Sequence, residues 1–408
     1  MKVVLLTSLY FPNMPGGVER AVKTLAEALL ARGHEPVVIC TSTDGQTRRD
    51  VVDGVPVHYV ALRNVYPLRP NERRHRLAKP IWHAIDTANI AMAGVVGELL
   101  DRERPDVLHT NNLAGFSALT WSAASSRRLP IVHTLHDYYL LCPRSTMFAG
   151  GRNCTRQHLG CVLYSWPRIK LSRHVDAVVG VSRFVVDRHA SHGAFPRATA
   201  HVIGNPCSAP PLGERDVHAA FRIGYLGRLE EAKGVEHLLK AVGRLGQPNW
   251  ELSVGGRGTP EIEDRLRATH TDGRIHFLGH VNAAAFFAGI DLLVIPSLSN
   301  ETFGMVAVEA FAAGVPVLAS RRGGLPEVVE EGVTGGLFEP NSTEELRAKL
   351  EEFIAEPARA HAMRGRCLAR ARDFDPMTIA ARYEAVYCQA MVSAGAKNLR
   401  EKQGTARL

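Results

Sequence analysis

Short runs of Val, Leu and Ile alternate with longer helical patterns along the chain, and the alternation stops once, at residues 203–213. Such alternation is typical of parallel β-sheets covered by helices. The interruption holds three Pro and two Gly without periodicity, which is typical of a linker. A chain of 408 residues is also too long for one ordinary core. We therefore expect two doubly wound α/β domains that meet near residues 206–216.

Helices are expected over 17–32, 235–245 and 374–391, and the last of these has an amphipathic pattern. Its residues Tyr383, Tyr387 and Met391 recur at four-residue steps, so this helix needs a groove. The expected strands cover 1–7, 36–41, 106–109, 130–135, 177–182, 221–226, 250–254, 274–277, 291–295 and 315–319. Ligands bind at the carboxyl ends of strands in such sheets, so the loops that follow strands are the places to search.

Charge is unevenly distributed. Residues 1–206 hold 25 Lys and Arg against 15 Asp and Glu, a net charge of +10. The whole chain has a net charge of +8, so the remaining residues contribute −2. The densest part, Arg63 to Lys79, fits an anionic membrane surface or an anionic acceptor, and a solvated face is the alternative. Aromatic residues do not interleave with these arginines, which disfavours nucleic acid.

The composition is that of a soluble globular protein, and the chain begins with a strand pattern that lacks a cleavage site. The most apolar helical stretch, 88–100, is too short to cross a bilayer. We therefore expect a cytoplasmic protein that can also lie against the inner face of a membrane.

Seven cysteines in a cytoplasmic chain argue against a disulfide framework. Cys142, Cys154, His158 and Cys161 cluster in the sequence, and three thiols with an imidazole can form a structural zinc site. The close C-x2-C pair that marks such sites is missing. Free thiols in a long loop are the favoured interpretation, with zinc as the alternative.

Residues 297–314 contain two glutamates eight positions apart. Glu301 falls in a polar loop after an apolar run, and Glu309 falls in a helix that is otherwise almost wholly apolar. A carboxylate among apolar side chains needs a partner, because burying an unpaired charge is costly; a salt-bridged surface helix is the alternative. The helix should begin near Gly304, which leaves the amides of residues 303–305 as donors at its positive end. This arrangement fits a ligand with both phosphates and hydroxyls.

A second loop, residues 227–234, follows a strand and places Arg228 and Lys233 between glycines. Arg offers a planar fork for phosphate oxygens and Lys a mobile point charge. The pair therefore fits a diphosphate, and a surface loop with scattered charges is the alternative. The spacing of a Walker phosphate loop is absent.

Two glycine turns also follow strands. Gly16 and Gly17 open the first helix, where a ligand can approach the backbone closely and the helix start favours an anion. Gly255 and Gly256 form a turn in the second half. Neither turn matches G-x-G-x-x-G, so dinucleotide binding is not indicated.

Polar side chains end two strands of the first half. His136 and Asp137 follow a buried strand and suit a polar reaction pair, although a histidine there is as often structural. His109 and Asn111, at the end of the neighbouring strand, are candidate acceptor contacts.

Together these motifs resemble the retaining family-4 glycosyltransferases, also called glycosyl transferases group 1. The resemblance rests on five motifs that follow one another along the chain in the family's order. They are G-G at 16–17, H-D at 136–137, G-R-x(4)-K-G at 227–234, E-x(7)-E at 301–309 and G-G-[LIV]-P-E at 323–327. It covers residues 1 to about 390 and implies a GT-B fold of two Rossmann-like domains. Residues 1–206, completed by the helix 374–391, would form the acceptor side, and residues 207–373 would bind the nucleotide-sugar.

The resemblance implies a metal-independent hexosyl transfer from a nucleotide-diphosphate sugar, such as UDP-GlcNAc, UDP-glucose or GDP-mannose, to an acceptor hydroxyl. Arg228 and Lys233 would stabilise the leaving diphosphate, while Glu301 and His136 would act beside the sugar. Glu309 would bind the ribose. The acceptor would be a lipid-linked sugar, a polysaccharide or a small molecule. The other implied donor contacts are Gly16, Gly17, Gly255, Gly256, Phe303, Gly304 and Met305.

Two other classes of function stay open at this stage. A sugar-nucleotide epimerase shares the architecture and would consume the sugar nucleotide without an acceptor. A non-catalytic basic binding protein would bind lipid or nucleic acid in a salt-sensitive way that does not depend on Glu301.

Overall fold

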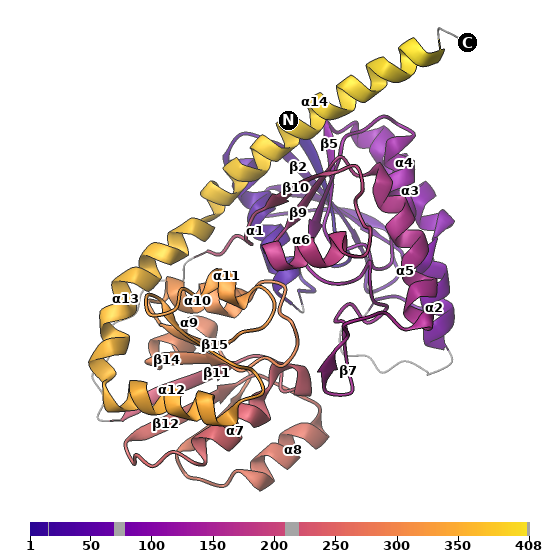
Figure 1. Ribbon diagram of the computed structural model, residues 1–408. Helices are drawn as coiled ribbons and strands as arrows, with labels where there is room; N and C mark the ends of the chain where they lie inside the picture. The colour runs from indigo at the N-terminus through magenta and orange to yellow at the C-terminus, as the bar shows by residue number, and fades with distance from the viewer. Residues whose placement is uncertain (15, 69–77, 209–219, 406–408) are drawn as a thin grey trace. The chain divides into compact units, whose positions relative to one another are not determined.

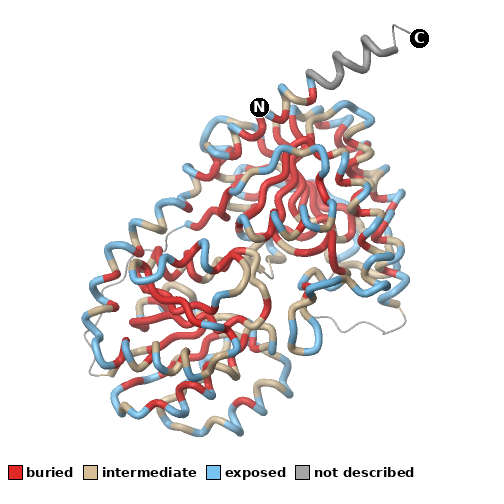
Figure 2. The backbone as a smooth tube through the Cα atoms, viewed as in Figure 1, coloured by how far each residue is buried: buried red, intermediate tan, exposed pale blue. Residues whose placement is uncertain are grey.

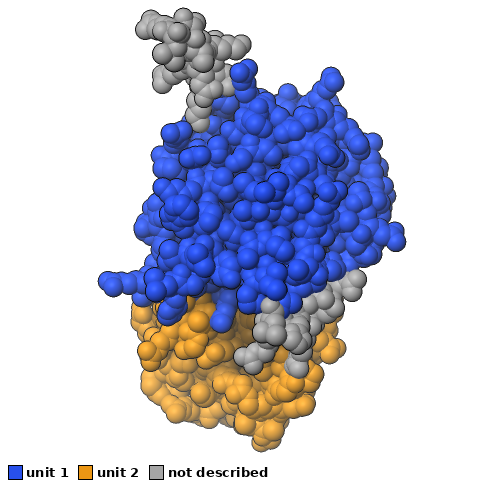
Figure 3. Space-filling model, turned by 90° about the vertical axis from the view of Figure 1, so that its right-hand side faces the viewer, with its two compact units in different colours: residues 1–147, 155–206, 376–408 blue, residues 148–154, 207–375 orange. Residues whose placement is uncertain are grey.

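The computed structural model describes residues 1–14, 16–68, 78–208 and 220–405. The chain divides into two compact units (Figure 3), namely 1–147 with 155–206 and 376–408, and 148–154 with 207–375. Compared with the expected domains, the second unit additionally takes residues 374–375 and a short segment, 148–154, from within the first half.

Unit 1 is built on a mostly parallel sheet with the strand order β10-β9-β6-β5-β1-β2-β4-β3. Its strands are β1 Lys2–Leu6, β2 Glu35–Thr41, β3 Arg48–Val52, β4 Val55–Val60, β5 Val107–Thr110, β6 Ile131–Leu135, β9 Ala177–Gly180 and β10 Thr199–Val202. Only β3, which pairs with β4, runs antiparallel. The chain winds outward from β1 in one direction and from β5 in the other, so the strand order reverses between β1 and β5.

Seven α-helices of unit 1 lie within the described residues: α1 Gly17–Ala31, α2 Ala78–Thr87, α3 Ile90–Glu103, α4 Leu119–Ser125, α5 Leu159–Leu171, α6 Arg183–Ala190 and α14 Pro376–Thr405. The central strands are buried on both faces, as Figure 2 shows, which explains their near-continuous apolar sequence. Helix α1 illustrates the packing: Val22, Leu25 and Leu29 recur on one face and are buried in the core. Gly33, with φ of 81°, follows the end of this helix.

Helix α14 supplies part of the core of unit 1 although it lies at the other end of the sequence (Figure 1). Tyr383 and Tyr387 are 2% and 0% exposed. The Tyr383 hydroxyl lies 3.0 Å from Thr134 Oγ1, and the Tyr387 hydroxyl lies 2.8 Å from His109 Nδ1. The groove that this amphipathic helix needs is therefore the surface beside β5 and β6.

Unit 2 contains a fully parallel sheet with the order β13-β12-β11-β14-β15-β16. Its strands are β11 Phe221–Leu226, β12 Trp250–Gly255, β13 Ile275–Gly279, β14 Leu292–Ile295, β15 Val317–Ser320 and β16 Gly335–Phe338. The strand order reverses between β11 and β14. In doubly wound sheets this reversal marks the ligand-binding crevice.

The helices of unit 2 within the described residues are α7 Val235–Val242, α8 Pro260–Thr269, α9 Ala283–Ala288, α10 Met305–Ala312, α11 Leu325–Val328, α12 Thr343–Ala355 and α13 Pro357–Ala371. A small antiparallel hairpin, β7 Phe148–Ala149 with β8 Arg152–Asn153, also belongs to this unit. The expected architecture of two doubly wound α/β sheets is confirmed. No helix among the described residues has the length and apolarity needed to cross a membrane.

Candidate active site

The loops that follow β11 and β14 meet at the point of strand reversal in unit 2. Two backbone amides of the β14 loop, Leu298 N and Ser299 N, donate to the carbonyl of Ala232 in the β11 loop at 2.9 and 3.0 Å. Gly234 makes this approach possible, because a Cβ there would lie 1.9 Å from the carbonyl oxygen of Pro296. The sequence therefore needs glycine at 234 to bring the two loops together.

Lys233 and Glu301 are the charged pair that this junction assembles. Lys233 Nζ donates to Glu301 Oε1 at 2.6 Å, and Ser297 Oγ donates to the same oxygen at 2.6 Å. Burial alone would raise the pKa of Glu301, but the charge and hydrogen bond of Lys233, helped by Ser297 and the charge of Arg228, hold it below its usual value. Glu301 is therefore a carboxylate at neutral pH, with its side chain 15% exposed.

Arg228 lies in the same loop with a very different exposure. Its side chain is 70% exposed and pairs with Glu230 at 3.0 Å. Its backbone carbonyl is fixed, since the Tyr225 hydroxyl donates to it at 2.7 Å. The loop thus holds the backbone of Arg228 in place and leaves the guanidinium able to reach an anion.

The glycine turn after β15 fixes the backbone of Glu301. Gly324 N donates to Glu301 O at 2.7 Å. A Cβ at Gly323 would lie 1.9 Å from the same oxygen, and Gly323 has φ of 59°, so only glycine fits there without strain. The G-G-[LIV]-P-E motif thus supports the position of Glu301.

Gly255 and Gly256 act through the backbone. Gly227 N donates to Gly255 O at 3.1 Å. Gly256 has φ of 132°, and a Cβ there would lie 1.7 Å from Gly227 O. These glycines therefore hold the β12 loop against the loop that carries Arg228, which is a structural reason for them beside the expected nucleotide contact.

Helix α10 begins where the sequence indicates. Gly304 precedes it with φ of 106°, and Met305 is its first residue. Phe303 is buried, and its ring lies edge-on to Phe374 with centroids 5.4 Å apart. The first amides of a helix have no preceding turn to bond to, so this end suits an anionic ligand.

Glu309 lies among apolar neighbours, as the sequence indicates, but it is not fully buried. Its neighbours Ala307, Val308, Ala310 and Phe311 are fully buried, but Glu309 itself is partly exposed. Partial exposure lowers the cost of its charge. It is the fifth residue of α10, the helix that begins beside the Glu301 loop.

Asn153 is a residue that the sequence analysis did not find. Its side-chain amide donates to Leu298 O at 2.8 Å, while its Oδ1 accepts from Asn300 N at 2.8 Å. The β7–β8 hairpin thereby holds the loop that leads to Glu301. The two partners lie about 145 positions away in sequence, so no local pattern could reveal them.

Unit 1 contains a small cavity at the carboxyl ends of β5 and β6. Its lining includes Asn111, His136, Asp137 and Tyr139. His136 Nε2 lies 3.0 Å from Asn111 Oδ1, and Asn111 Nδ2 is buried without a hydrogen-bond partner among the described residues. A buried amide without a partner is a place where a ligand can gain a hydrogen bond.

Burial changes the protonation of the cavity residues. It lowers the pKa of His136 to about 4 and raises the pKa of Asp137 to about 6. Asp137 accepts from Tyr139 N at 2.8 Å and from Asn112 Nδ2 at 3.2 Å. At neutral pH the cavity thus presents a neutral imidazole beside a carboxylate.

His109 does not join this cavity. It is 0% exposed, and its two ring nitrogens lie 2.8 Å from the Tyr387 hydroxyl and 2.7 Å from Thr134 Oγ1. Burial lowers its pKa to about 3. Both nitrogens are occupied within the core beneath α14, so the prediction that His109 contacts the acceptor is wrong.

Gly16 and Gly17 lie at the start of α1, at the carboxyl end of β1. The buried carboxylate of Glu19 accepts from Gly16 N at 3.1 Å, and burial raises the pKa of Glu19. One of the amides expected to face an anion is thus taken by the protein's own carboxylate.

Two other predictions concern a zinc site and the basic segment of the first half. Among the described residues, no group of three or more His, Cys, Asp or Glu lies close enough to hold a metal ion. Zinc at Cys142, Cys154, His158 and Cys161 stays a prediction without a preformed site. The basic segment Arg63 to Lys79 lies partly outside the described residues, which omit 69–77.

The fold and the charged loops at the strand reversal define a two-domain α/β transferase of the GT-B class. Residues 15–208 match the family model described as Glycosyltransferase Family 4, and residues 217–370 match Glycosyl transferases group 1. The glycogen synthase of Mycobacterium tuberculosis is 30% identical over 412 residues, covering 96% of this chain and 95% of that protein. The chain therefore belongs to the family-4, group 1 glycosyltransferases.

Solved structures agree on the fold. The sucrose-phosphate synthase of Thermosynechococcus elongatus superposes with a TM-score of 0.76 at 20% identity, covering 96% of this chain and 99% of that one. The Anabaena protein HepE in complex with UDP gives a TM-score of 0.70 at 20% identity, covering 95% and 99%.

Proposed function

We propose that this glycosyltransferase takes a sugar from a nucleotide-diphosphate sugar, with a UDP-sugar favoured, and transfers it to an acceptor hydroxyl with retention of configuration. The Lys233–Glu301 pair at the strand reversal of unit 2 carries the proposal. Cations beside a helix start suit a diphosphate, and an ionised carboxylate beside them suits sugar hydroxyls. The likeness to the HepE complex supports uridine as the base.

The leaving diphosphate gains negative charge as the bond to the sugar breaks. Arg228 and Lys233 stabilise that charge, and the start of α10 adds to it. Glu301 binds sugar hydroxyls and favours the positive charge that develops at the anomeric carbon. The acceptor attacks from the face that the diphosphate leaves, and a departing phosphate oxygen takes the acceptor's proton. Glu309 binds the ribose.

The small cavity of unit 1 is the proposed binding place of the acceptor hydroxyl. Asp137 accepts a hydrogen bond from an acceptor hydroxyl, and the Asn111 amide donates one. His136 acts beside the transferred sugar. Because burial lowers its pKa to about 4, its ring is neutral at pH 7 and adds no positive charge there. A lipid-linked sugar, a polysaccharide or a small molecule can each present such a hydroxyl.

Metal independence is part of the proposal, because the side-chain cations Arg228 and Lys233 and the amides at the start of α10 can together supply the positive charge that a diphosphate needs. Turnover should persist in excess EDTA. Complete loss that magnesium or manganese restores would contradict this part. Slow loss accompanied by unfolding would instead support zinc at the cysteine cluster.

Thermal unfolding with UDP-, GDP- and dTDP-sugars tests the donor, since a ligand that binds the folded state stabilises it by RT ln(1 + [L]/Kd). A UDP-sugar should raise Tm in the wild type and less in Lys233→Ala. Product analysis with and without an acceptor then separates transfer from epimerisation. Consumption of the sugar nucleotide to an epimer without any acceptor would overturn the transferase proposal.

A further inference from the structure

The outer face of α5 exposes a stripe of large apolar side chains. Leu159, Leu163 and Trp166 are 90%, 73% and 59% exposed. Their spacing of four and three residues places them on one side of the helix, together with Val162, which is 38% exposed. Single exposed apolar residues are ordinary, but a clustered stripe that includes Trp marks an interaction surface.

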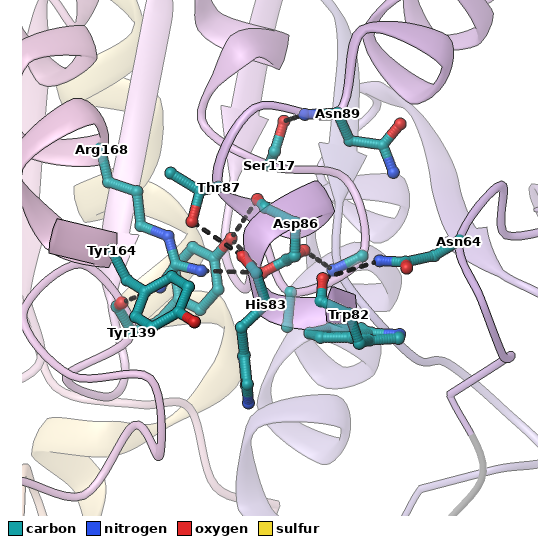
Figure 4. Close-up of polar contacts among 12 residues, drawn as sticks. Asn64, Trp82, His83, Asp86, Thr87, Asn89, Ser117, Tyr139, Tyr164 and Arg168 are labelled. Carbon is teal, nitrogen blue, oxygen red and sulfur yellow. Dashed lines mark hydrogen bonds and ion pairs between the residues drawn. The ribbon is translucent and has the colours of Figure 1, made fainter. Parts of the chain in front are cut away.

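The neighbouring helix α2 adds to this part of the surface. Tyr164 of α5 and His83 of α2 are in ring contact, with centroids 6.0 Å apart (Figure 4). Ile81 of α2 is 55% exposed, and Lys79 and Pro80 beside it are exposed as well. The two helices thus expose apolar side chains next to a cation.

The exposed charges that flank the stripe in sequence are positive. Residues 155–175 of unit 1 contain no Asp or Glu, and the Arg168 guanidinium among them is buried against Asp86. Arg156, Lys170 and Arg173, which flank the stripe in sequence, are all exposed, and Lys170 Nζ lies 5.7 Å from the centroid of the Trp166 ring. A helix with Trp and Leu on one face and cations at its edges is typical of a segment that lies in the interface of an anionic bilayer.

We propose that the outer face of α5 docks this protein on an anionic membrane. Leu159, Leu163 and Trp166 enter the headgroup region, while Lys170 and Arg173 contact anionic headgroups. A bilayer is favoured over a protein partner because the exposed apolar side chains lie beside exposed cations, the combination that suits an anionic headgroup region over an apolar interior. The inference does not depend on which sugar is transferred.

The inner face of α5 connects this surface to the cavity of unit 1. Arg168 is fully buried, and its Nη2 donates to Asp86 Oδ2 at 3.0 Å while its Nη1 donates to Tyr139 O at 2.8 Å (Figure 4). Tyr139 lines the cavity, and its hydroxyl donates to Asp86 Oδ2 at 2.7 Å. A docked α5 would therefore hold the acceptor cavity in a fixed relation to the bilayer.

The tryptophans provide a selective test. Trp82, Trp121 and Trp250 are 5%, 0% and 1% exposed, so water contact is concentrated at Trp166. Vesicles of phosphatidylcholine with phosphatidylglycerol should shift the emission of the full chain to the blue and protect it from acrylamide. Vesicles of phosphatidylcholine alone should do so much less. Trp166→Phe should remove most of the shift.

Co-sedimentation with the same vesicles measures affinity. Leu159→Ser with Leu163→Ser should weaken binding by about tenfold or more, since the two side chains would no longer transfer apolar surface from water into the bilayer. Val51→Ser is the matched control, because Val51 is 62% exposed on β3 of the same unit, and it should bind as the wild type does. Lys170→Glu with Arg173→Glu should abolish the preference for anionic vesicles.

Two results would overturn the proposal. One is wild-type protein that stays unbound to anionic vesicles at low salt, or that binds equally after the Leu substitutions. The other is a wild-type dimer in light scattering that the Leu substitutions convert to a monomer, because the stripe would then be covered by a second copy. Unchanged Tm values in the variants show that any loss of binding is not a loss of fold.

Discussion

Lys233 is hydrogen-bonded to Glu301, whereas Arg228 is mostly exposed, and this difference predicts unequal effects of losing each cation. Lys233→Ala removes a donor aimed at the developing charge and also leaves Glu301 without its main partner. We expect kcat to fall about 10²–10³-fold. Arg228→Ala removes a cation that must first move to the ligand, so a smaller loss is expected. Steady-state kinetics on both folded variants checks this, and near wild-type turnover in the double variant would refute the diphosphate assignment.

Glu301 and Glu309 should respond differently to neutralisation. Glu301→Gln keeps the shape but loses the charge beside the anomeric carbon, so kcat should fall about 10²-fold while KM for the donor changes little. Glu309 is assigned to the ribose, away from the bond that breaks, so Glu309→Gln should mainly raise KM. Kinetics with varied donor decides the matter. If each variant shows the effect expected of the other, the two roles are exchanged.

Asp137 predicts the pH dependence of acceptor use. Burial raises the pKa of this carboxyl to about 6, so it is protonated below that pH and ionised above it. If the ionised form accepts the acceptor's hydrogen bond, kcat/KM for the acceptor should rise with pH through about 6. His136 has its pKa lowered to about 4 and does not account for a limb there. Asp137→Asn should remove the limb, and a limb that persists would show that another group titrates.

The raised pKa of Asp137 also affects stability, and in the opposite direction: a rise in pH that favours acceptor use lowers the free energy of unfolding. A carboxyl with a raised pKa binds its proton more tightly in the folded protein than in the unfolded chain. Its contribution to the free energy of unfolding therefore falls as pH rises from about 4 to about 6. Asp137 thus weakens the fold at the pH where its charge would serve binding, which is typical of a functional carboxylate.

Single elements differ in how well the sequence predicts them. The start of α10 was predictable, because Gly304 separates a polar loop from an apolar helix. Strand β3 was not, since four of its five residues are exposed and it lacks an apolar face. Strand β16 begins with two glycines, which are depleted in strands, although all four of its residues are buried.

The candidate site also has features that the sequence predicts and features that it does not. Lys233 and Glu301 were both found from local motifs, but the hydrogen bond between them depends on two loops 68 positions apart. His109 was misplaced for a related reason. Its position at a strand end indicated a site, whereas the residue that covers it, Tyr387, lies 278 positions away. Local patterns identify chemical groups, but only the tertiary fold decides which of them face a ligand.

The β7–β8 hairpin gives a prediction about one element. Asn153→Ala removes both hydrogen bonds that hold the backbone of residues 298–300. We expect kcat/KM to fall about fivefold to thirtyfold, which corresponds to about 1–2 kcal/mol. Arg152→Ala, the exposed neighbour on the same strand, is the control and should leave kinetics unchanged. Equal kinetics in both variants would show that the hairpin does not position the Glu301 loop.

At the scale of the whole chain, residues from both ends build unit 1. Helix α14 places Ile379, Tyr383 and Tyr387 in the same core as β1, β2 and α1. An ion pair between Arg32 and Glu384, 2.6 Å apart, adds a contact at the surface. Unit 1 is therefore completed only when the last helix is present, after unit 2 has been traversed.

Substitutions of Tyr387 test whether the packing of α14 stabilises unit 1. Tyr387→Ala removes a fully buried ring and leaves His109 Nδ1 without its hydroxyl partner, so the free energy of unfolding should fall by about 3–5 kcal/mol. Tyr387→Phe keeps the ring and loses only the hydrogen bond, which should cost about 1–2 kcal/mol. Val392→Ala, at a position of the same helix that is 74% exposed, is the control and should change little. Denaturant unfolding measures all three. If Tyr387→Ala is no less stable than Val392→Ala, the claim that α14 completes unit 1 is contradicted, because the helix would then contribute nothing to the core.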